Sequence, residues 1–316
     1  MPKVTIIIPL YNAEDTIEDC VNAILAQEYS DFELLLCNDG SKDKSGDICE
    51  DLAKNDPRIR VFHLIHEGVS SARNCGLNHA VGDYIAFADS DDKPEAGWLS
   101  SLINHRKFDG LSVCGYLVED TEGNFLYSTA NTSEGDSIVE ITSEQFIEDI
   151  FSNRLMYQGY IWNKLFSRKL IDQNLPLRYN EKISYNEDRL FLFWYLLRCR
   201  RVSYSGKPQY VYTKKEDSEQ YNPKQATELH AFYIMCRVLE QNSMQQALFY
   251  AEKDFFRASA MLYAKAIESD SLDAYWIGKY VVKLSNYIGE FDNYPENIKN
   301  IMRKSLICAK EGAHRK

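Results

Sequence analysis

Three carboxylates are crowded into four residues of the segment YIAFADSDDKPE, residues 84–95. Asp89, Asp91 and Asp92 directly follow an apolar run with the composition of a buried strand. The chain already has a formal net charge of −11 at pH 7, so this crowding needs compensation. Mg²⁺ and Mn²⁺ prefer oxygen ligands and commonly bind one or two carboxylates together with substrate phosphates. The segment therefore predicts part of a metal site that a phosphate-bearing substrate completes. A second interpretation stays open, in which the acids are solvated or Asp92 caps a following helix.

Strands that alternate with helices must position these acids. Continuous apolar runs, typical of strands buried on both faces, occupy residues 4–8, 32–37 and 84–88, and a shorter strand fits residues 60–64. Helical spacing of apolar residues falls between them, at 13–27, 44–55 and 70–80. The alternating order predicts an α/β protein with a mainly parallel, Rossmann-like sheet that carries helices on both faces.

Polar residues follow each of the three strong strands. The segments are PLYNAE, NDGSKD and DSDD. In an open parallel sheet the ligand crevice lies beyond the carboxyl ends of the strands, so we expect the three segments to share one rim. The first segment lacks the glycines of a dinucleotide-binding turn, and no GxxxxGK[ST] run is present. A nucleotide held through a divalent cation fits this acidic rim.

The composition limits the remaining classes. The 36 Lys and Arg residues against 47 Asp and Glu residues exclude the basic stripe of a general nucleic-acid binder. None of the eight cysteines forms a CxxC pair, which indicates reduced thiols. The N-terminus lacks the pattern of an export signal, and no apolar run approaches the length of a membrane span. We expect a cytoplasmic protein, and peripheral contact with the membrane is left open.

Four ordered motifs resemble a known family. TIIIPLYNAEDTIEDCVNAILAQ, FELLLCNDGSKDKS, GVSSARNCGLNHAVGDYIAFADSDD and the later YNED are similar to bacterial glycosyltransferase family 2. The match is continuous through about the first 95 residues and resumes in patches near 160–195. The resemblance implies a GT-A fold, a nucleotide-sugar donor, a Mn²⁺ or Mg²⁺ ion and inversion at the anomeric carbon.

The resemblance also implies roles for individual residues. Tyr11 stacks on the base with the Pro9 backbone holding it, Asp39 accepts the imide hydrogen of uracil, and Arg73 approaches the ribose and diphosphate. Asp89 contacts the ribose hydroxyls and Asp91 ligates the metal, with Asp92 either behind it or capping a helix. The nucleotide-sugar site as predicted comprises Pro9, Tyr11, Asn12, Glu14, Asp39, Arg73, Asp89 and Ser90. For Glu14, a place in the first turn of a helix is an equal alternative.

The acceptor hydroxyl needs a base on the face of the sugar opposite the departing nucleotide. In the family this base comes from an acidic pair, which corresponds to Glu187 and Asp188 before the apolar run at 190–197. We assign the base to Asp188, with Glu187 as the second candidate or as an orienting neighbour. A helix-capping role of Asp188 stays open beside the catalytic one. Trp162, in a segment that also resembles the family, is either a wall of the sugar site or a core residue.

From about residue 216 the composition changes to long helices, at 228–241 and 244–267. We therefore predict a catalytic domain over 1–215, with its nucleotide-binding part at about 1–95 and its acceptor part at about 96–215, and a helical module over 216–316. The module could clasp the catalytic domain, form a homodimer or lie on a membrane. The predicted activity is transfer of a sugar from a UDP-sugar to a glycan, in a polysaccharide or on a lipid carrier, with a β-linkage. A nucleotidyltransferase and a non-catalytic nucleotide-sugar-binding protein are the alternatives.

Overall fold

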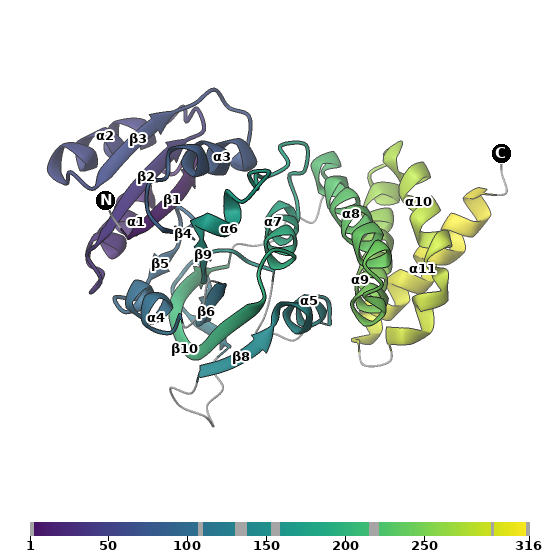
Figure 1. Cartoon of the computed structure of the whole chain (residues 1–316). Coiled ribbons are helices and arrows are strands. Elements are labelled where there is room, and N and C mark those ends of the chain that lie inside the picture. Colours follow the sequence, from purple (N-terminus) through teal and green to yellow (C-terminus); the bar gives the residue numbers. More distant parts are fainter. Residues whose placement is uncertain are drawn as a thin grey trace. The chain divides into compact units, whose positions relative to one another are not determined.

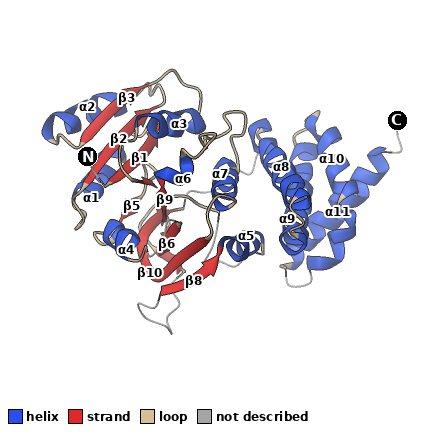
Figure 2. Ribbon diagram, viewed as in Figure 1, coloured by secondary structure: helices blue, strands red, loops and turns tan. Residues whose placement is uncertain are grey.

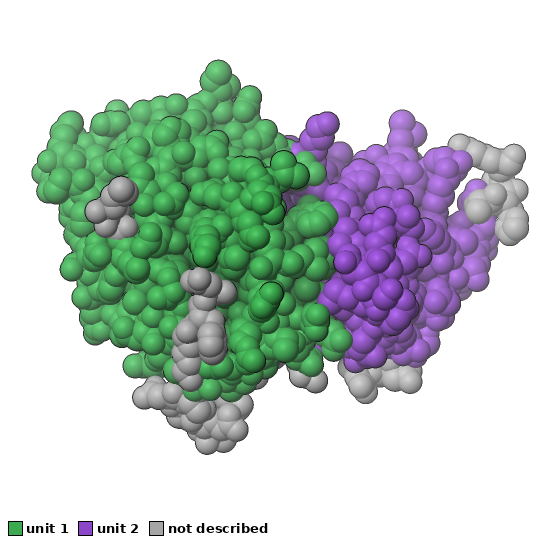
Figure 3. Space-filling view, viewed as in Figure 1, with its two compact units in different colours: residues 1–150, 154–181, 188–215 green, residues 151–153, 182–187, 216–316 purple. Residues whose placement is uncertain are grey.

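The computed structural model describes residues 3–106, 110–129, 138–152, 159–214, 221–291 and 294–313. The chain forms two compact units (Figure 3). The first comprises residues 1–150, 154–181 and 188–215, and the second comprises residues 151–153, 182–187 and 216–316.

The first unit is built on one sheet (Figures 1 and 2). Its strands are β1 (Val4–Leu10), β2 (Phe32–Asn38), β3 (Ile59–His63), β4 (Tyr84–Phe87), β5 (Lys93–Pro94), β6 (Leu111–Glu119), β7 (Phe125–Ser128), β8 (Ile138–Thr142), β9 (Lys164–Ser167) and β10 (Arg201–Thr213). The order across the sheet is β3-β2-β1-β4-β9-β6-β10-β5, with β7 paired to β6 and β8 paired to β10.

The part of the sheet that the sequence predicts is parallel. β1 lies between β2 and β4 and pairs with both, so that Ile6 is opposite Leu34 on one side and Ala86 on the other. β3 extends the parallel part on the far side of β2. Every residue of β1, β2 and β4 is buried, which is why these strands appear in the sequence as unbroken apolar runs.

Beyond β4 the sheet is mixed. β9 runs antiparallel to both β4 and β6, and β10 runs parallel to β6. The short strand β5, which follows the acidic turn, pairs with β10 antiparallel. The pairing of β5 with β10 therefore joins the later half of the first unit to the segment that carries the acids.

Helices cover both faces of the sheet, as predicted. In the first unit they are α1 (Ile17–Leu25), α2 (Ser45–Asn55), α3 (Val69–His79), α4 (Trp98–Asn104), α5 (Ser143–Phe151), α6 (Arg168–Ile171) and α7 (Glu187–Leu196). One core cluster joins Ile6 and Ile8 of β1 to α1 and α4. On the opposite face α3 contacts Ile7 so closely that a Cβ on Gly76 would collide with the Ile7 side chain. Glycine at position 76 therefore sets the spacing between α3 and β1.

The second unit is helical. It contains α8 (Thr227–Gln241), α9 (Gln245–Glu268), α10 (Asp273–Lys283) and α11 (Glu296–Ala313), with 3-10 turns at Pro223–Ala226 and Ser285–Phe291. Helix α9 contacts α8, α10 and α11, and its buried aromatic side chains form the core, as in the stacked pair of Phe232 and Phe255 at 5.6 Å. None of the helices in the described residues is both long enough and apolar enough to cross a membrane.

Candidate active site

The carboxyl ends of β2, β1 and β4 lie side by side, and the three polar segments leave the sheet at this edge. The amide of Asp39, just after β2, donates to the carbonyl of Leu10 at the end of β1 (2.8 Å). The amide of Ala88, just after β4, donates to the carbonyl of Ile7 in β1 (3.1 Å). The side chains of this rim thus start from adjacent points of the backbone.

The loop after β1 and the loop after β2 hold each other in place. The amide of Lys42 donates to Oδ1 of Asn12 (2.9 Å), and the amide of Asn12 donates to Oγ of Ser41 (2.9 Å). The amide of Lys44 donates to Oε2 of Glu14 (3.0 Å). Since α1 begins only at Ile17, Glu14 lies before the helix and not in its first turn. In this structure both Asn12 and Glu14 shape the rim by binding its neighbouring loop.

Asp39 organises a third loop. Its carboxylate accepts the amides of Glu67 and Gly68, both at 2.9 Å, and Nδ1 of His66 lies 2.8 Å from its Oδ2 atom. The residue is 2% exposed. An ionised carboxylate offers about four acceptor positions, and the two amides take two of them. Asp39 therefore fixes the segment before α3.

The aromatic ring of Tyr11 lies over that loop. It stacks on the His66 imidazole, with ring centroids 4.1 Å apart and planes 24° apart. Tyr11 is 40% exposed, so part of it faces solvent, whereas Pro9 is buried inside β1 opposite Cys37. Tyr11, His66 and Asp39 form one contiguous group at the end of β1 and β2.

Arg73 connects α3 to the acidic turn. Its guanidinium lies 3.2 Å from Oδ1 of Asp89 and 5.3 Å from the ring centroid of Tyr179. The side chain is 6% exposed, so Arg73 is not a solvated surface residue. A buried arginine beside a carboxylate keeps a fixed cation at this rim.

Asp92 is the innermost acid of the turn, with 0% exposure. Its Oδ2 accepts the hydroxyl of Tyr210 (3.0 Å), and its Oδ1 accepts the amide of Thr213 (3.0 Å). Burial, together with Asp89 and Asp91, raises the pKa of Asp92 to about 9, against the lowering effect of these two donors. The expected capping role is wrong, because α4 begins at Trp98 and Asp92 points instead to β10. Largely neutral at pH 7, Asp92 relieves part of the crowding.

Asp89 and Asp91 form the outer part of the turn, and both are half-buried, as is Ser90. The amide of Asp89 donates to the Tyr210 hydroxyl (3.2 Å). Burial raises the pKa of Asp89; Arg73 opposes this, while Asp91 and Asp188 add to it. Asp91 and Asp188 therefore both act on Asp89 through their negative charge.

The acidic turn suits a hard cation. Asp89 lies beside Arg73, and Asp92 binds Tyr210 and Thr213. Asp91 is half-buried in the same turn, and its role as the metal ligand stays a prediction. Within the described ranges no group of three or more His, Cys, Asp or Glu side chains could hold a metal by itself. A Mg²⁺ or Mn²⁺ ion bound at this turn would take its other ligands from phosphate oxygens and water.

Asp188 lies in the first turn of α7, which begins at Glu187 and not after the pair as expected. Its Oδ1 accepts the amide of the adjacent Arg189 (2.7 Å). Asp188 also acts on the buried Lys164 of β9, whose pKa burial lowers to about 7 while Cys114 and Asp188 oppose the shift. The negative charge of Asp188 thus acts on both Asp89 and Lys164. Glu187 is half-buried at the start of the helix.

An aromatic group adjoins the acids, and of its four members the sequence analysis named only Trp162. The indole of Trp162 is stacked on Tyr210 (4.6 Å) and on two half-buried rings, Tyr160 (5.0 Å) and Tyr212 (5.4 Å). Burial raises the pKa of Tyr212, and Tyr160, Asp92, Asp89 and Asp91 add to this effect. The alternation in QYVYT could have indicated that Tyr210 and Tyr212 share a strand face, but no local pattern links them to a turn about residue 90.

Comparison with known proteins agrees with this geometry. The model of the family described as "Glycosyl transferase family 2" matches residues 5–174. The uncharacterized glycosyltransferase EpsJ of Bacillus subtilis is 31% identical over 253 residues, which are 79% of this chain and 70% of that protein. The GalNAc(5)-diNAcBac-PP-undecaprenol beta-1,3-glucosyltransferase of Campylobacter jejuni is 26% identical over 271 residues, or 84% and 82% of the two chains.

Among solved structures, S. aureus TarS in complex with UDP superposes with a TM-score of 0.63 at 17% identity, covering 98% of this chain and 92% of that one. This likeness confirms the predicted GT-A fold. The matched segment contains the strand ends, the acidic turn and Arg73, and the resemblance seen in the sequence is confirmed. With its acidic rim on a GT-A sheet, the chain belongs to glycosyl transferase family 2 and is a glycosyltransferase.

Proposed function

We propose that this glycosyltransferase moves a sugar from a UDP-sugar to a hydroxyl group of a glycan acceptor, with a divalent metal and with inversion to a β-linkage. The observation that carries the proposal is the position of the acidic turn, with Arg73 3.2 Å from Asp89, at the edge where β1, β2 and β4 end. The Arg73 guanidinium supplies a cation at this edge that is suited to ribose and phosphate oxygens.

The nucleotide is proposed to bind between the loops after β1 and β2. The partly exposed ring of Tyr11 would stack on the base, a contact worth about 1–3 kcal/mol in nucleic-acid systems. Asp39 is proposed to accept the imide N–H of uracil, because a carboxylate can accept more hydrogen bonds than the two from Glu67 and Gly68, and this is the support for UDP as the carrier. Because Asp39 also holds His66, Glu67 and Gly68, base binding and the conformation of that loop are linked.

The leaving diphosphate is proposed to lie beside the acidic turn. A Mg²⁺ or Mn²⁺ ion held by Asp91 would stabilise the charge that develops on the diphosphate as the glycosidic bond breaks. Asp89 is placed to accept hydrogen bonds from ribose hydroxyls, with Arg73 fixing its orientation at 3.2 Å. Ser90 lies between the two acids, where its hydroxyl can bind the same ligand.

Inversion requires deprotonation of the acceptor hydroxyl as it attacks the anomeric carbon. Asp188 is proposed as the base, and the support is that its carboxylate acts on Asp89 across the site. Glu187, the preceding residue, is the second candidate. The proton would pass to a carboxylate oxygen of Asp188 while the bond from the sugar to the diphosphate breaks.

The acceptor is proposed to contact the half-buried rings of Tyr160 and Tyr212, since flat aromatic surfaces suit the apolar faces of sugar rings. Trp162, buried beneath them, would hold these rings and not itself touch the sugar. The similarity to an enzyme whose name specifies an undecaprenol-linked substrate supports a lipid-linked or polysaccharide acceptor, used at the cytoplasmic side of a membrane.

The test is the release of UDP from a panel of UDP-sugars, with GDP-mannose as the competing donor, before and after chelation and with Mn²⁺ or Mg²⁺ restored. We expect metal-dependent release from at least one UDP-sugar in wild type and its loss in Asp91→Asn. Asp51→Asn is the matched control, because Asp51 is an exposed acid paired with Lys54 on α2.

Three other results would each contradict the proposal. Pyrophosphate as the product from a sugar phosphate and UTP would identify a nucleotidyltransferase. Tight binding of UDP-sugars without any turnover on a glycan panel would identify a non-catalytic binding protein. An Asp91→Asn variant as active as wild type, together with activity that chelation does not lower, would show that the reaction does not need the metal.

A further inference from the structure

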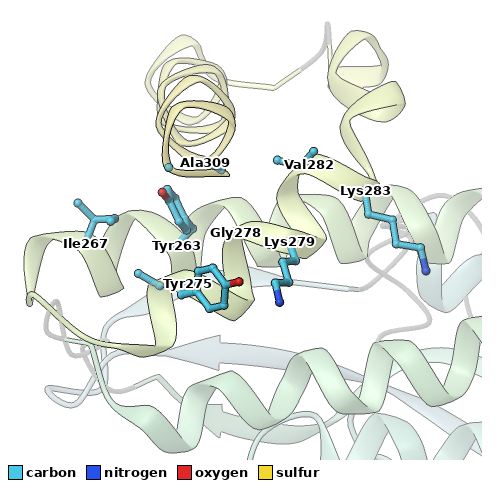
Figure 4. A pocket seen from close by; sticks show the side chains of 10 residues that line it. Tyr263, Ile267, Tyr275, Gly278, Lys279, Val282, Lys283 and Ala309 are labelled. Atoms are coloured by element: carbon cyan, nitrogen blue, oxygen red, sulfur yellow. The ribbon is translucent and has the colours of Figure 1, made fainter. Parts of the chain in front are cut away.

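The second unit contains an apolar groove between α9, α10 and α11 (Figure 4). Its volume is about 550 Å³, within the range of sites that hold small organic ligands. It is lined by Tyr263 and Ile267 of α9, by Ala274, Tyr275, Gly278, Lys279, Val282 and Lys283 of α10, and by Ala309 and Gly312 of α11.

The groove exists because α10 and α11 carry small residues where they face it. A Cβ added to Gly278 would meet Cε2 of Tyr263 at 2.9 Å and the Cβ atom of Ala309 at 3.5 Å, so the wall there is closely packed. A Cβ on Gly312 would meet nothing within 4 Å, so this end of the groove is open. The groove is therefore a built feature of the helix packing, with one closed and one open part.

Exposed apolar side chains surround the groove. Leu272, in the turn between α9 and α10, is 94% exposed, and the lining residues Ile267 and Tyr275 are 51% and 52% exposed. Single exposed apolar residues are ordinary, but a group beside an apolar groove marks an interaction surface.

The charged residues that line the groove are both lysines. Lys279 and Lys283 are one helical turn apart on α10, and Nζ of Lys279 lies 4.4 Å from the ring centroid of Tyr275. Neither lysine forms an ion pair in the part of the chain that the structure describes. Acidic residues lie nearby, but none of them lines the groove: Glu268 ends α9, Asp270 is in the following turn, Asp273 begins α10, and Glu311 precedes Gly312 on α11.

A groove that has an apolar lining and two cations favours a ligand with both an apolar part and an anionic group. A second copy of the chain docked by the same face would bring four lysines together, because a two-fold interface uses the same patch on both partners. A nucleic acid would leave the apolar lining unused. A membrane lipid with a phosphate head group satisfies both parts of the surface.

We propose that this groove binds an anionic phospholipid at a bilayer surface. An acyl chain lies along Tyr263, Ala309 and Gly312, the phosphate contacts Lys279 and Lys283, and Leu272 enters the interface between head groups and chains. The α10 face of the helical unit is thereby a membrane-docking surface. The inference depends on the second unit alone and not on the proposed donor or acceptor.

The experiment is co-sedimentation of the full chain with vesicles of phosphatidylcholine alone or with added phosphatidylglycerol. Wild type should bind the second kind and not the first, and binding should weaken as salt is raised. Replacing both lysines, Lys279→Gln with Lys283→Gln, should lower affinity roughly 30-fold. Lys224→Gln with Arg237→Gln removes two cations of the same unit that do not line the groove, and it should bind like wild type.

Two further variants distinguish the groove from general charge. Lys279→Arg with Lys283→Arg keeps both cations and should retain binding. Gly312→Trp fills the open end without an existing contact and should reduce binding although the net charge is unchanged. UDP release in solution should be the same in all these variants, which separates this proposal from the proposed catalytic function.

Several outcomes would overturn the inference. These are equal binding to neutral and anionic vesicles, equal loss in the lysine pair and its control pair, or full binding by Gly312→Trp. A wild-type dimer in sedimentation velocity that Gly312→Trp converts to a monomer would assign the groove to a second copy of the chain instead.

Discussion

Lys164 offers a quantitative test of the electrostatics behind the site. It lies in β9, at the middle of the sheet, with 1% exposure, and Nζ donates to Oδ1 of Asn163 (2.8 Å). Burial lowers its pKa from 10.5 to about 7, against the opposing effects of Cys114 and Asp188. The perturbation is Lys164→Met, which keeps much of the volume and removes the amine.

The expected magnitude follows from linkage. At pH 6 the folded protein holds the ammonium form, and its burial costs about 5 kcal/mol relative to the unfolded chain. At pH 8.5 the folded side chain is neutral, and the cost is that of deprotonating an ordinary lysine, about 3 kcal/mol. A depressed lysine pKa therefore destabilises most at low pH, and the penalty falls as pH rises from about 7 toward 10.5.

The assay is urea unfolding of wild type and Lys164→Met at pH 6 and at pH 8.5. The variant's gain in unfolding free energy over wild type should be about 2 kcal/mol larger at pH 6 than at pH 8.5. Comparing the two proteins at each pH cancels the titration of the groups that do not interact with Lys164. Lys169→Met, at an exposed position of α6, should show no such change. An equal gap between Lys164→Met and wild type at both pH values would refute the idea of a neutral amine in the sheet.

Further predictions concern the rim and its support. Asp91→Asn should lower metal-dependent UDP release by about 100-fold or more, measured by a coupled UDP assay, and an unchanged metal titration would reject Asp91 as the ligand. Asp188→Asn should keep UDP-sugar affinity in calorimetry while transfer falls by about 10²–10⁴, and a matching loss of affinity would place the base elsewhere. Tyr11→Ala should weaken UDP binding by about 1–3 kcal/mol, whereas Tyr11→Phe should not; equal affinities in both variants would argue against stacking. Gly76→Ala should destabilise the fold by about 1–3 kcal/mol in thermal unfolding, since the new Cβ would collide with Ile7.

The sequence predicts the parallel part of the fold because its signals are local. The strands β1, β2 and β4 are buried on both faces and appear as apolar runs, and each is followed by polar residues that must leave at the same edge. Tyr11, Asp39 and the acidic turn could therefore be assigned to one rim before any geometry was known. Their individual roles in binding and catalysis stay predictions.

The remaining features depend on contacts between distant residues. The hydroxyl of Tyr210 donates to Asp92, which is 118 positions away in the chain. No local sequence pattern could therefore have shown that Asp92 binds β10 and does not cap a helix. Strand β9 has only four residues, which is too short for a periodicity to be recognised in the sequence. Asn12 and Glu14 have side chains able to bind a ligand or a neighbouring loop, and each accepts a hydrogen bond from the neighbouring loop. Their place in the nucleotide-sugar site stays a prediction.

The return of β10 to the acidic turn limits how far the protein can be shortened. The segment shared with the family model ends at residue 174, whereas the partners of Asp92 lie at Tyr210 and Thr213. A fragment cut at that limit would expose the edge of β6 and leave a buried carboxyl group without its donors. The smallest autonomous catalytic piece must therefore extend through Thr213, well past the region by which relatives are recognised.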